Sequence, residues 1–147
     1  MALHPLTPDP AVWDAFVAAH PRAHLLQLSA WGALKAAFGW TPARVALADD
    51  AGTLVAGAQM LLRPLPARLG TLAYVPCGPL VDWADAAQVG ALLDALDAEA
   101  RRRGAILLKI EPGLGLDGAD FARLGFRPSL QTIQPPRTIV LDLSGDE

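Results

Sequence analysis

The stretch DWADAAQVGALLDALDAEARRRGAILLKI, residues 82–110, decides the fold of this chain. Its first part repeats apolar residues at helical spacing, which predicts an amphipathic helix. These residues are Val89, Leu92, Leu93, Leu96 and Ala100. Asp82, with Asp85 three residues later, resembles a capping box, and three arginines and a glycine suit the carboxyl end. The apolar run 105–110 follows at once and is typical of a buried central strand.

Three strands are predicted upstream of that helix. Residues 44–48 and 53–63 form apolar runs on either side of residues 49–52, whose composition suits a hairpin turn. Residues 71–75 form the third run and end at a proline. We therefore expect a three-strand meander before the long helix.

Two helices are predicted before the strands. Asp9 supplies a capping side chain and Pro10 suits the first helical position, while His20 precedes a proline that ends the helix. Ser29 caps the second helix and Gly39 closes it. The expected apolar faces are Trp13, Phe16 and Val17 in the first helix and Trp31, Leu34 and Phe38 in the second.

The last third of the chain predicts a short helix over residues 117–124 and a final strand over residues 138–143. Together these elements predict an α/β (α+β) fold with a mixed sheet flanked by helices, in a single domain over residues 1–147. Residues 144–147 resemble the N-cap and acidic first turn of a further helix. We therefore expect the chain to be truncated at its C-terminus.

The composition bounds the class of protein. An apolar share of 52% suits a packed core, and 12 basic against 15 acidic residues give no general attraction to nucleic acid or anionic membrane. One cysteine and three histidines are too few for a metal site, so no metal is expected. Neither a signal peptide nor a transmembrane segment is expected, and the cytoplasm is the expected location.

The predicted element order matches the acetyltransferase-like fold called GNAT. Several strings, taken in order, are more specific and resemble the FemABX family of peptidoglycan-bridge ligases. These strings are LQLSAWGALK (26–35), YVPCGP (74–79), LKIEP (108–112), LGF (124–126) and IQPPRT (133–138).

That resemblance implies two GNAT-like domains in one polypeptide and an aminoacyltransferase activity without a cofactor. Such an enzyme takes an amino acid from aminoacyl-tRNA and joins it to an amine on the stem peptide of a muramyl-pentapeptide precursor, which is nucleotide- or lipid-linked. This chain would be the first domain, inactive without its second GNAT-like domain.

The resemblance also implies a substrate-binding set. Lys35 belongs to the Trp-x-x-x-Lys string, whose lysine contacts phosphate of the nucleotide-linked precursor in the family. Trp31, Tyr74 and Arg137 complete the expected set. The structural alternatives are a lysine stem that covers Trp31, core roles for Trp31 and Tyr74, and a salt bridge for Arg137.

Glu111 is the candidate catalytic residue. It ends the apolar run 105–110, at the Lys-x-acid-Pro position where the family has an acidic residue near the reacting groups. It could orient the attacking amine or accept its proton, and the alternative is a structural role at the strand exit.

The segment 74–79 argues against acetyl-CoA as a cofactor. Acetyl-CoA-binding GNAT proteins hold pyrophosphate with the N–H groups of several glycines here, whereas this segment has one glycine and two prolines. Cys77 is expected to be a small packed residue and not a nucleophile. The functional alternatives are a stand-alone GNAT-like acyltransferase and a non-catalytic binding module.

Overall fold

The computed structural model describes residues 2–113, 115–116 and 121–135. Its strands are β1 (His4–Leu6), β2 (Thr41–Ala48), β3 (Leu54–Pro64), β4 (Thr71–Pro76) and β5 (Ala105–Glu111). Its α-helices are α1 (Pro10–Ala19), α2 (Ser29–Ala36) and α3 (Ala86–Arg102), and two short 3₁₀ helices are η1 (Leu25–Gln27) and η2 (Pro66–Arg68). The predicted meander, the two early helices and the long helix are therefore confirmed, and the three-residue β1 was missed.

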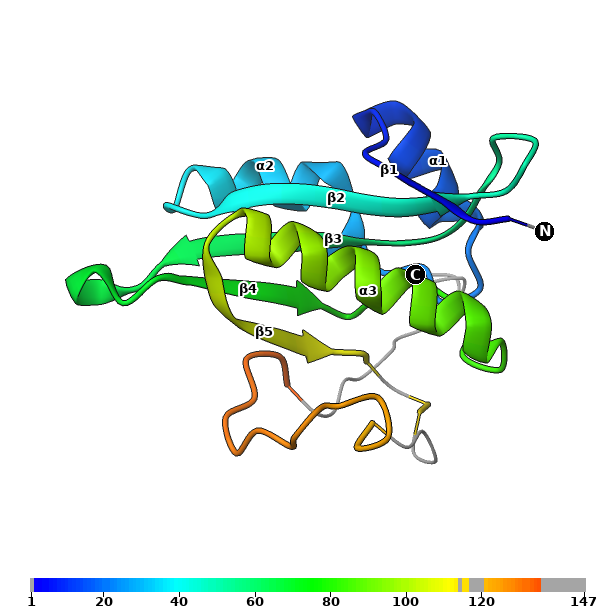
Figure 1. The fold of residues 1–147 in the computed structure, drawn as a ribbon. Helices are drawn as coiled ribbons and strands as arrows, with labels where there is room; N and C mark the ends of the chain where they lie inside the picture. Colours follow the sequence, from blue (N-terminus) through cyan, green and yellow to red (C-terminus); the bar gives the residue numbers. More distant parts are fainter. Residues whose placement is uncertain (1, 114, 117–120, 136–147) are drawn as a thin grey trace, which may run out of the picture.

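The strands form one mixed sheet in the order β1-β2-β3-β4-β5 (Figure 1). The first four strands pair antiparallel, and β5 pairs parallel to β4. The chain crosses between these two parallel strands through α3. The predicted mixed sheet flanked by helices is confirmed.

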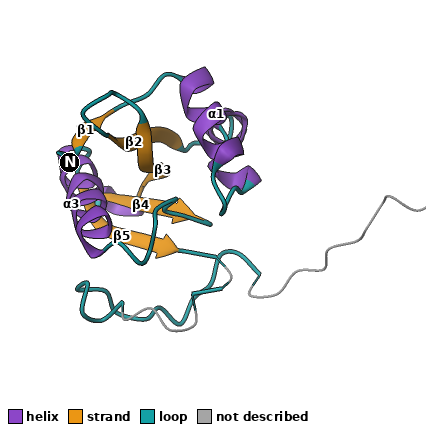
Figure 2. Cartoon of the chain, turned by 90° about the vertical axis from the view of Figure 1, so that its right-hand side faces the viewer, coloured by secondary structure: helices purple, strands orange, loops and turns teal. Residues whose placement is uncertain are grey.

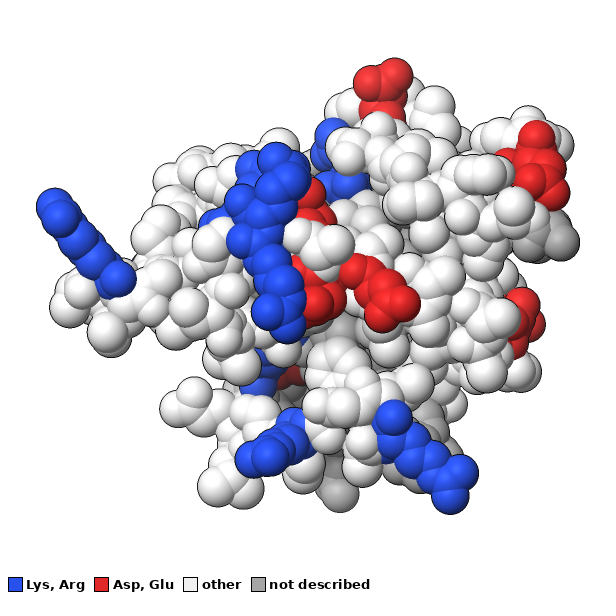
Figure 3. Space-filling model, viewed as in Figure 1, with Lys and Arg blue, Asp and Glu red and all other residues white. Residues whose placement is uncertain are grey.

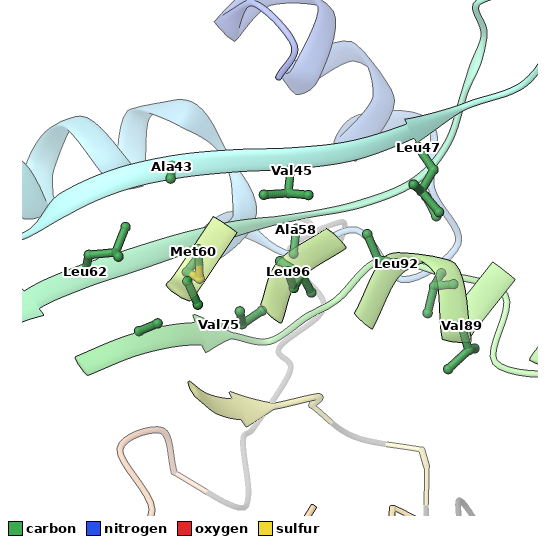
Figure 4. Close-up of a cluster of buried hydrophobic side chains, with 14 residues drawn as sticks. Ala43, Val45, Leu47, Ala58, Met60, Leu62, Val75, Val89, Leu92 and Leu96 are labelled. Atoms are coloured by element: carbon green, nitrogen blue, oxygen red, sulfur yellow. The ribbon is translucent and has the colours of Figure 1, made fainter. Parts of the chain in front are cut away.

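The helices cover both faces of the sheet (Figure 2). Helix α3 lies on one face, and α1 and α2 lie on the other. The main apolar cluster fills the space between the sheet and α3, where Val45, Met60 and Val75 meet Leu92 and Leu96 (Figure 4). Burying an aliphatic side chain of this size contributes about 1.5–3 kcal/mol, so this layer dominates the stability of the fold.

The helix caps differ from the prediction. Asp85 is the N-cap of α3, and its Oδ1 atom accepts hydrogen bonds from the N–H groups of Ala87 and Gln88. Asp82 does not cap α3, because its side chain closes the preceding turn by accepting from Ala84 N–H. The capping role that the sequence assigned to Asp82 is therefore wrong by three residues.

The prediction for α1 is right in position, because Asp9 is the N-cap and Pro10 begins the helix, although the Asp9 side chain makes no capping bond. The prediction for α2 is wrong. The N-cap of α2 is Leu28, and the Ser29 hydroxyl instead donates to Asp14 Oδ2 at 2.5 Å. Ser29 therefore joins α2 to α1 and does not close the helix end.

Strand β5 does not occupy the centre of the described sheet. It is the last strand in the pairing order, and the side chains of Ile106 and Leu107 are 67% and 56% exposed. Two side chains of the expected apolar face of α2 are also exposed, Leu34 and Phe38. The apolar sequence patterns of β5 and α2 therefore predicted more burial than these side chains have.

The predicted helix at 117–124 is not seen in its described part, because residues 121–124 form turns. Residues 117–120 and the predicted strand 138–143 lie outside the described residues. Within the described part of the chain, no helix combines the length and the apolar character needed to cross a bilayer.

Candidate functional site

Lys35 lies on α2, and its side chain reaches back along the helix to Trp31. The Lys35 Nζ atom is 5.0 Å from the centroid of the Trp31 ring, a cation–π contact. The four-residue spacing places both side chains on one helical face. The helix ends one residue later, and Trp40 N–H donates to the Lys35 carbonyl at 3.2 Å. The turn after α2 therefore brings the backbone of Trp40 to the end of the helix that carries Lys35.

Trp40 connects α2 to the strands beneath it. Its ring centroid lies 6.3 Å from that of Tyr74, and the Arg63 guanidinium lies over the same indole at 5.4 Å. Tyr74 points to the α2 side of the sheet, because its neighbours Ala73 and Val75 point into the cluster beneath α3.

Tyr74 in turn reaches Glu111 at the end of β5. The Tyr74 hydroxyl donates to Glu111 Oε2 at 2.6 Å. Backbone N–H groups of Ile133 and Gln134 also donate to the carboxylate, at 2.6 Å and 3.0 Å. The carboxylate therefore joins β4, β5 and the segment 129–134.

Lys109 fixes the same segment from the middle of β5. Its Nζ atom donates to Ser129 Oγ at 3.0 Å and to the Gln131 carbonyl, and lies 3.7 Å from Glu111 Oε1. Lys109 and Glu111 lie two residues apart on the strand, so both side chains leave the same face. Together they hold the segment against the end of the sheet.

These contacts shift the pKa values of Glu111 and Tyr74. Burial would raise the pKa of Glu111, but the Tyr74 hydroxyl, the two N–H groups and the Lys109 ammonium hold that pKa below its ordinary value. Burial first, and then the hydrogen bond to Glu111, raise the pKa of Tyr74. Glu111 is thus an ionised acceptor whose two oxygens already have donors, which favours the structural alternative over a general base.

Two buried glutamines position the strands on this side of the sheet. Gln27 Nε2 donates to the carbonyls of Pro76 and Gln59, at 2.6 Å and 3.3 Å, and its Oε1 accepts from Gln59 N–H at 2.6 Å. Gln59 Nε2 donates to the Leu28 carbonyl at 2.8 Å. The Trp13 indole donates to the Gln27 carbonyl at 2.6 Å. This glutamine pair ties the start of α2 to the end of β4, next to Tyr74.

Cys77 follows β4 with a φ of +47°. Burial raises the pKa of its thiol, and the nearby Glu111 carboxylate raises it further. A thiol held neutral in this way is a poor nucleophile. No group of three or more potential metal-binding side chains occurs among the described residues.

A separate apolar cavity of about 510 Å³ lies between α3, β5 and the loop after it. Its walls include Trp83, Leu93, Leu108, Ile110, Phe121 and Phe126. It contains none of the predicted substrate-binding side chains, so volume alone does not identify the candidate site.

The structure brings four of the five predicted site residues into one row of contacts. Trp31, Lys35, Tyr74 and Glu111 are linked through Trp40. Arg137 lies outside the described residues.

Three residues that contact the row, Trp40, Arg63 and Lys109, were not among the predicted site residues. The alternation of β3 could have placed Arg63 on the side opposite Leu62. Lys109 interrupts an apolar strand, which is itself a signal for a partner at that position.

The chain matches the family model described as the FemAB family over residues 9–125. It is 34% identical over 148 residues to the "Lipid II:glycine glycyltransferase" of Staphylococcus aureus, strain USA300, and to the protein of the same name from strain RF122 / ET3-1. Each match covers 91% of this chain and 35% of the relative. The chain therefore spans about a third of the length of these relatives.

Solved structures agree with this relationship. The crystal structure of FemX matches with a TM-score of 0.74 and 32% identity, over 82% of this chain and 30% of that one. An acetyltransferase of Trypanosoma brucei matches with a TM-score of 0.63 and 17% identity, over 97% and 100% of the two chains. The fold is therefore GNAT-like, as predicted.

Proposed function

Because this chain belongs to the FemAB family, we propose that it is the N-terminal GNAT-like half of a two-domain aminoacyltransferase of peptidoglycan-bridge synthesis. The relatives it resembles are named for glycyl transfer to lipid II, and the match covers nearly all of this chain. The proposed acceptor is the stem peptide of a muramyl-pentapeptide precursor, the proposed donor is aminoacyl-tRNA, and the proposed location is the cytoplasm.

The proposed reaction is aminolysis of an ester. The acceptor nitrogen attacks the carbonyl carbon of the aminoacyl ester, a C–N bond forms, and the C–O bond to the tRNA breaks. The amine must lose a proton, and the tRNA hydroxyl leaves with one, so atoms and charges balance without a redox partner. The proton can pass through the substrates themselves or through a protein base.

The row of contacts from Lys35 to Glu111 is the observation that carries this proposal. Lys35 is half-buried against an indole, and the turn to Trp40 fixes the helix end that presents it. Arg63 adds a second cation, over the indole of Trp40. Two cations beside indole rings suit a ligand that combines phosphate with a flat ring, as a nucleotide-linked precursor does.

We assign Glu111 the role of a positioning residue in this proposal. Its carboxylate holds the segment 129–134 and orients the Tyr74 hydroxyl. If Glu111 were instead the catalytic base, as the sequence analysis considered, a different result is expected. A Glu111→Gln variant of the two-domain protein would have a lower kcat and an unchanged affinity for the precursor.

A calorimetric titration with the nucleotide-linked muramyl-pentapeptide tests the binding role. We expect Lys35→Ala to raise the Kd about tenfold, the effect of losing one charge-assisted contact. Arg101→Ala is the matched control, because it removes one cation from an exposed site on α3. Equal affinities of the wild type and Lys35→Ala would refute the assignment of Lys35.

The same titration with acetyl-CoA separates the stand-alone acyltransferase from the ligase. Acetyl-CoA binding without precursor binding would favour the acyltransferase. Binding of neither ligand by the two-domain protein would favour a non-catalytic module.

A further inference from the structure

We propose that one end of this molecule binds the surface of an anionic lipid bilayer. This hairpin end comprises residues 35–39 at the end of α2 and after it, residues 63–70 from the end of β3 to β4, and residues 101–106 from the end of α3 to the start of β5. The inference rests on the proposed function for its biological setting, since a lipid-linked acceptor lies in a bilayer. Its physical basis is independent of that function and is the combination of exposed apolar side chains with unpaired cations.

The topology places these three segments at the same end of the sheet (Figure 1). Strand β2 starts at Thr41, which pairs with Leu62 close to the exit of β3. Strand β4 starts at Thr71, which pairs with Ala105 directly after α3. The turn after α2, the β3–β4 hairpin and the carboxyl end of α3 therefore adjoin one another.

The tip of the β3–β4 hairpin is a turn that non-glycine residues seldom form. Leu69 N–H donates to the Pro66 carbonyl at 3.2 Å, and the two central residues, Ala67 and Arg68, have φ values of +55° and +57°. Each left-handed residue with a side chain costs about 1 kcal/mol. This conformation presents Arg68 and Leu69 side by side at the tip, both exposed to solvent.

Large apolar side chains are exposed at this end of the molecule. Leu69 is 64% exposed, and Phe38 and Ile106 are each 67% exposed. Gly70 lies so close to Ile106 that a Cβ atom on the glycine would stand 2.6 Å from Ile106 Cγ2. The hairpin base therefore adjoins one of the exposed apolar side chains directly. Apolar side chains that project beside cations are typical of proteins that insert shallowly into a bilayer.

The charges at this end have the sign that an anionic bilayer attracts. Within the described residues, Lys35, Arg63 and Arg68 form no ion pair with a carboxylate. The three arginines that end α3 add to them, although they pair with Asp97 and Glu99.

Many of the acidic side chains lie elsewhere. The β2–β3 turn carries Asp49 and Asp50 at the opposite end of the sheet. Figure 3 shows a basic side chain at the left tip and a column of basic side chains over the end of α3, with some acidic side chains beside that column and others toward the right. The excess of basic side chains at the left orients the hairpin end toward a negative surface.

The apolar side chains favour a bilayer over a nucleic acid as the partner. A phosphate backbone would use the cations but would leave Leu69 and Ile106 in water. A bilayer uses both, because the arginines reach the headgroups while the apolar side chains enter the acyl boundary.

Sedimentation with lipid vesicles tests the proposal, using the whole chain without any precursor. We expect binding to vesicles of equal parts phosphatidylglycerol and phosphatidylcholine, and little binding to phosphatidylcholine alone. Leu69→Ser and Arg68→Gln should each weaken binding about fivefold, because each removes one apolar or one charged contact. Leu25→Ser is the matched control, since Leu25 is 61% exposed before the start of α2, and it should leave binding unchanged.

Three results would overturn the proposal: no binding to the anionic vesicles, equal binding to the neutral vesicles, or equal losses for Leu25→Ser and Leu69→Ser. Binding of tRNA that depends on Arg68 but not on Leu69, without vesicle binding, would assign the surface to nucleic acid instead. The precursor titration contains no lipid, so failure here and failure of the proposed function are separate results.

Discussion

The two faces of the sheet are covered by different kinds of buried side chain. The layer beneath α3 is an apolar cluster of alanine, valine, leucine and methionine side chains. The layer beneath α1 and α2 has a smaller apolar cluster around Trp13 and Leu80. It also contains the buried pair Gln27 and Gln59, whose side chains form hydrogen bonds with the backbone at several points. One face therefore supplies most of the stabilising buried apolar area, whereas the other also fixes the positions of particular atoms.

The candidate site lies on the second face. Apolar packing tolerates small shifts, because its energy depends on area and shape and not on single atom pairs. A hydrogen bond between buried groups depends on distance and angle, so it fixes the strand end that carries Tyr74. The polar face is thus suited to present a ligand surface.

The largest effect is expected on the apolar face. Leu96→Ala should lower the free energy of unfolding by about 3 kcal/mol, because the side chain is fully buried and leaves a cavity. Urea unfolding followed by circular dichroism measures this loss. Leu93→Ala on the same helix is the control, and its partly buried side chain should cost less. Equal losses would remove the basis for calling this face the stabilising one.

The next largest effect is expected at the glutamine pair. Gln27→Leu should lower the free energy of unfolding by about 2 kcal/mol, since it leaves the Pro76 carbonyl and the Gln59 N–H without partners. Gln88→Leu is the control beneath α3, where the side chain accepts a single bond from Asp82 N–H. The same urea titration compares them. A loss at Gln27 no larger than at Gln88 would contradict the positioning role of the polar face.

The smallest effect is expected at Glu111 and depends on pH. Its folded pKa is lowered, so its contribution is present above the unfolded carboxyl pKa, about 4.3, and is lost as the pH falls through the lower folded pKa. Glu111→Gln should cost about 1 kcal/mol at pH 7 and should flatten this part of the stability profile. Thermal unfolding between pH 7 and pH 3 measures both. A wild-type profile that Glu111→Gln leaves unchanged would count against the proposed anchor.

Much of the fold follows from local patterns in the sequence. Helix α3, the β2–β3 hairpin and the start of α1 were predicted because periodicity, turn residues and proline act within a few residues of each other. The errors arose where the answer depends on a distant partner. Ser29 has the composition of a cap, but Asp14 of another helix takes its hydroxyl.

The candidate site was only partly predictable for the same reason. The Trp-x-x-x-Lys string identifies Trp31 and Lys35 because both lie on one helix. Arg63 joins them only because β3 passes beneath the turn at Trp40. Ile133 contacts Glu111 although the two residues are 22 positions apart in the sequence. No local sequence pattern predicts a contact over that separation.

The order of the polar and apolar faces along the chain has a consequence for synthesis on the ribosome. The contacts of Gln27 need residues only as far as Pro76, whereas the cover of the apolar face begins at Ala86. Since residues up to Pro76 leave the ribosome before α3 does, the residues that form these contacts are available first. The strand side chains destined to lie beneath α3 then face water until Arg102 has left the ribosome. An apolar strand face that lacks its covering helix is the kind of surface that makes partly folded chains prone to aggregate.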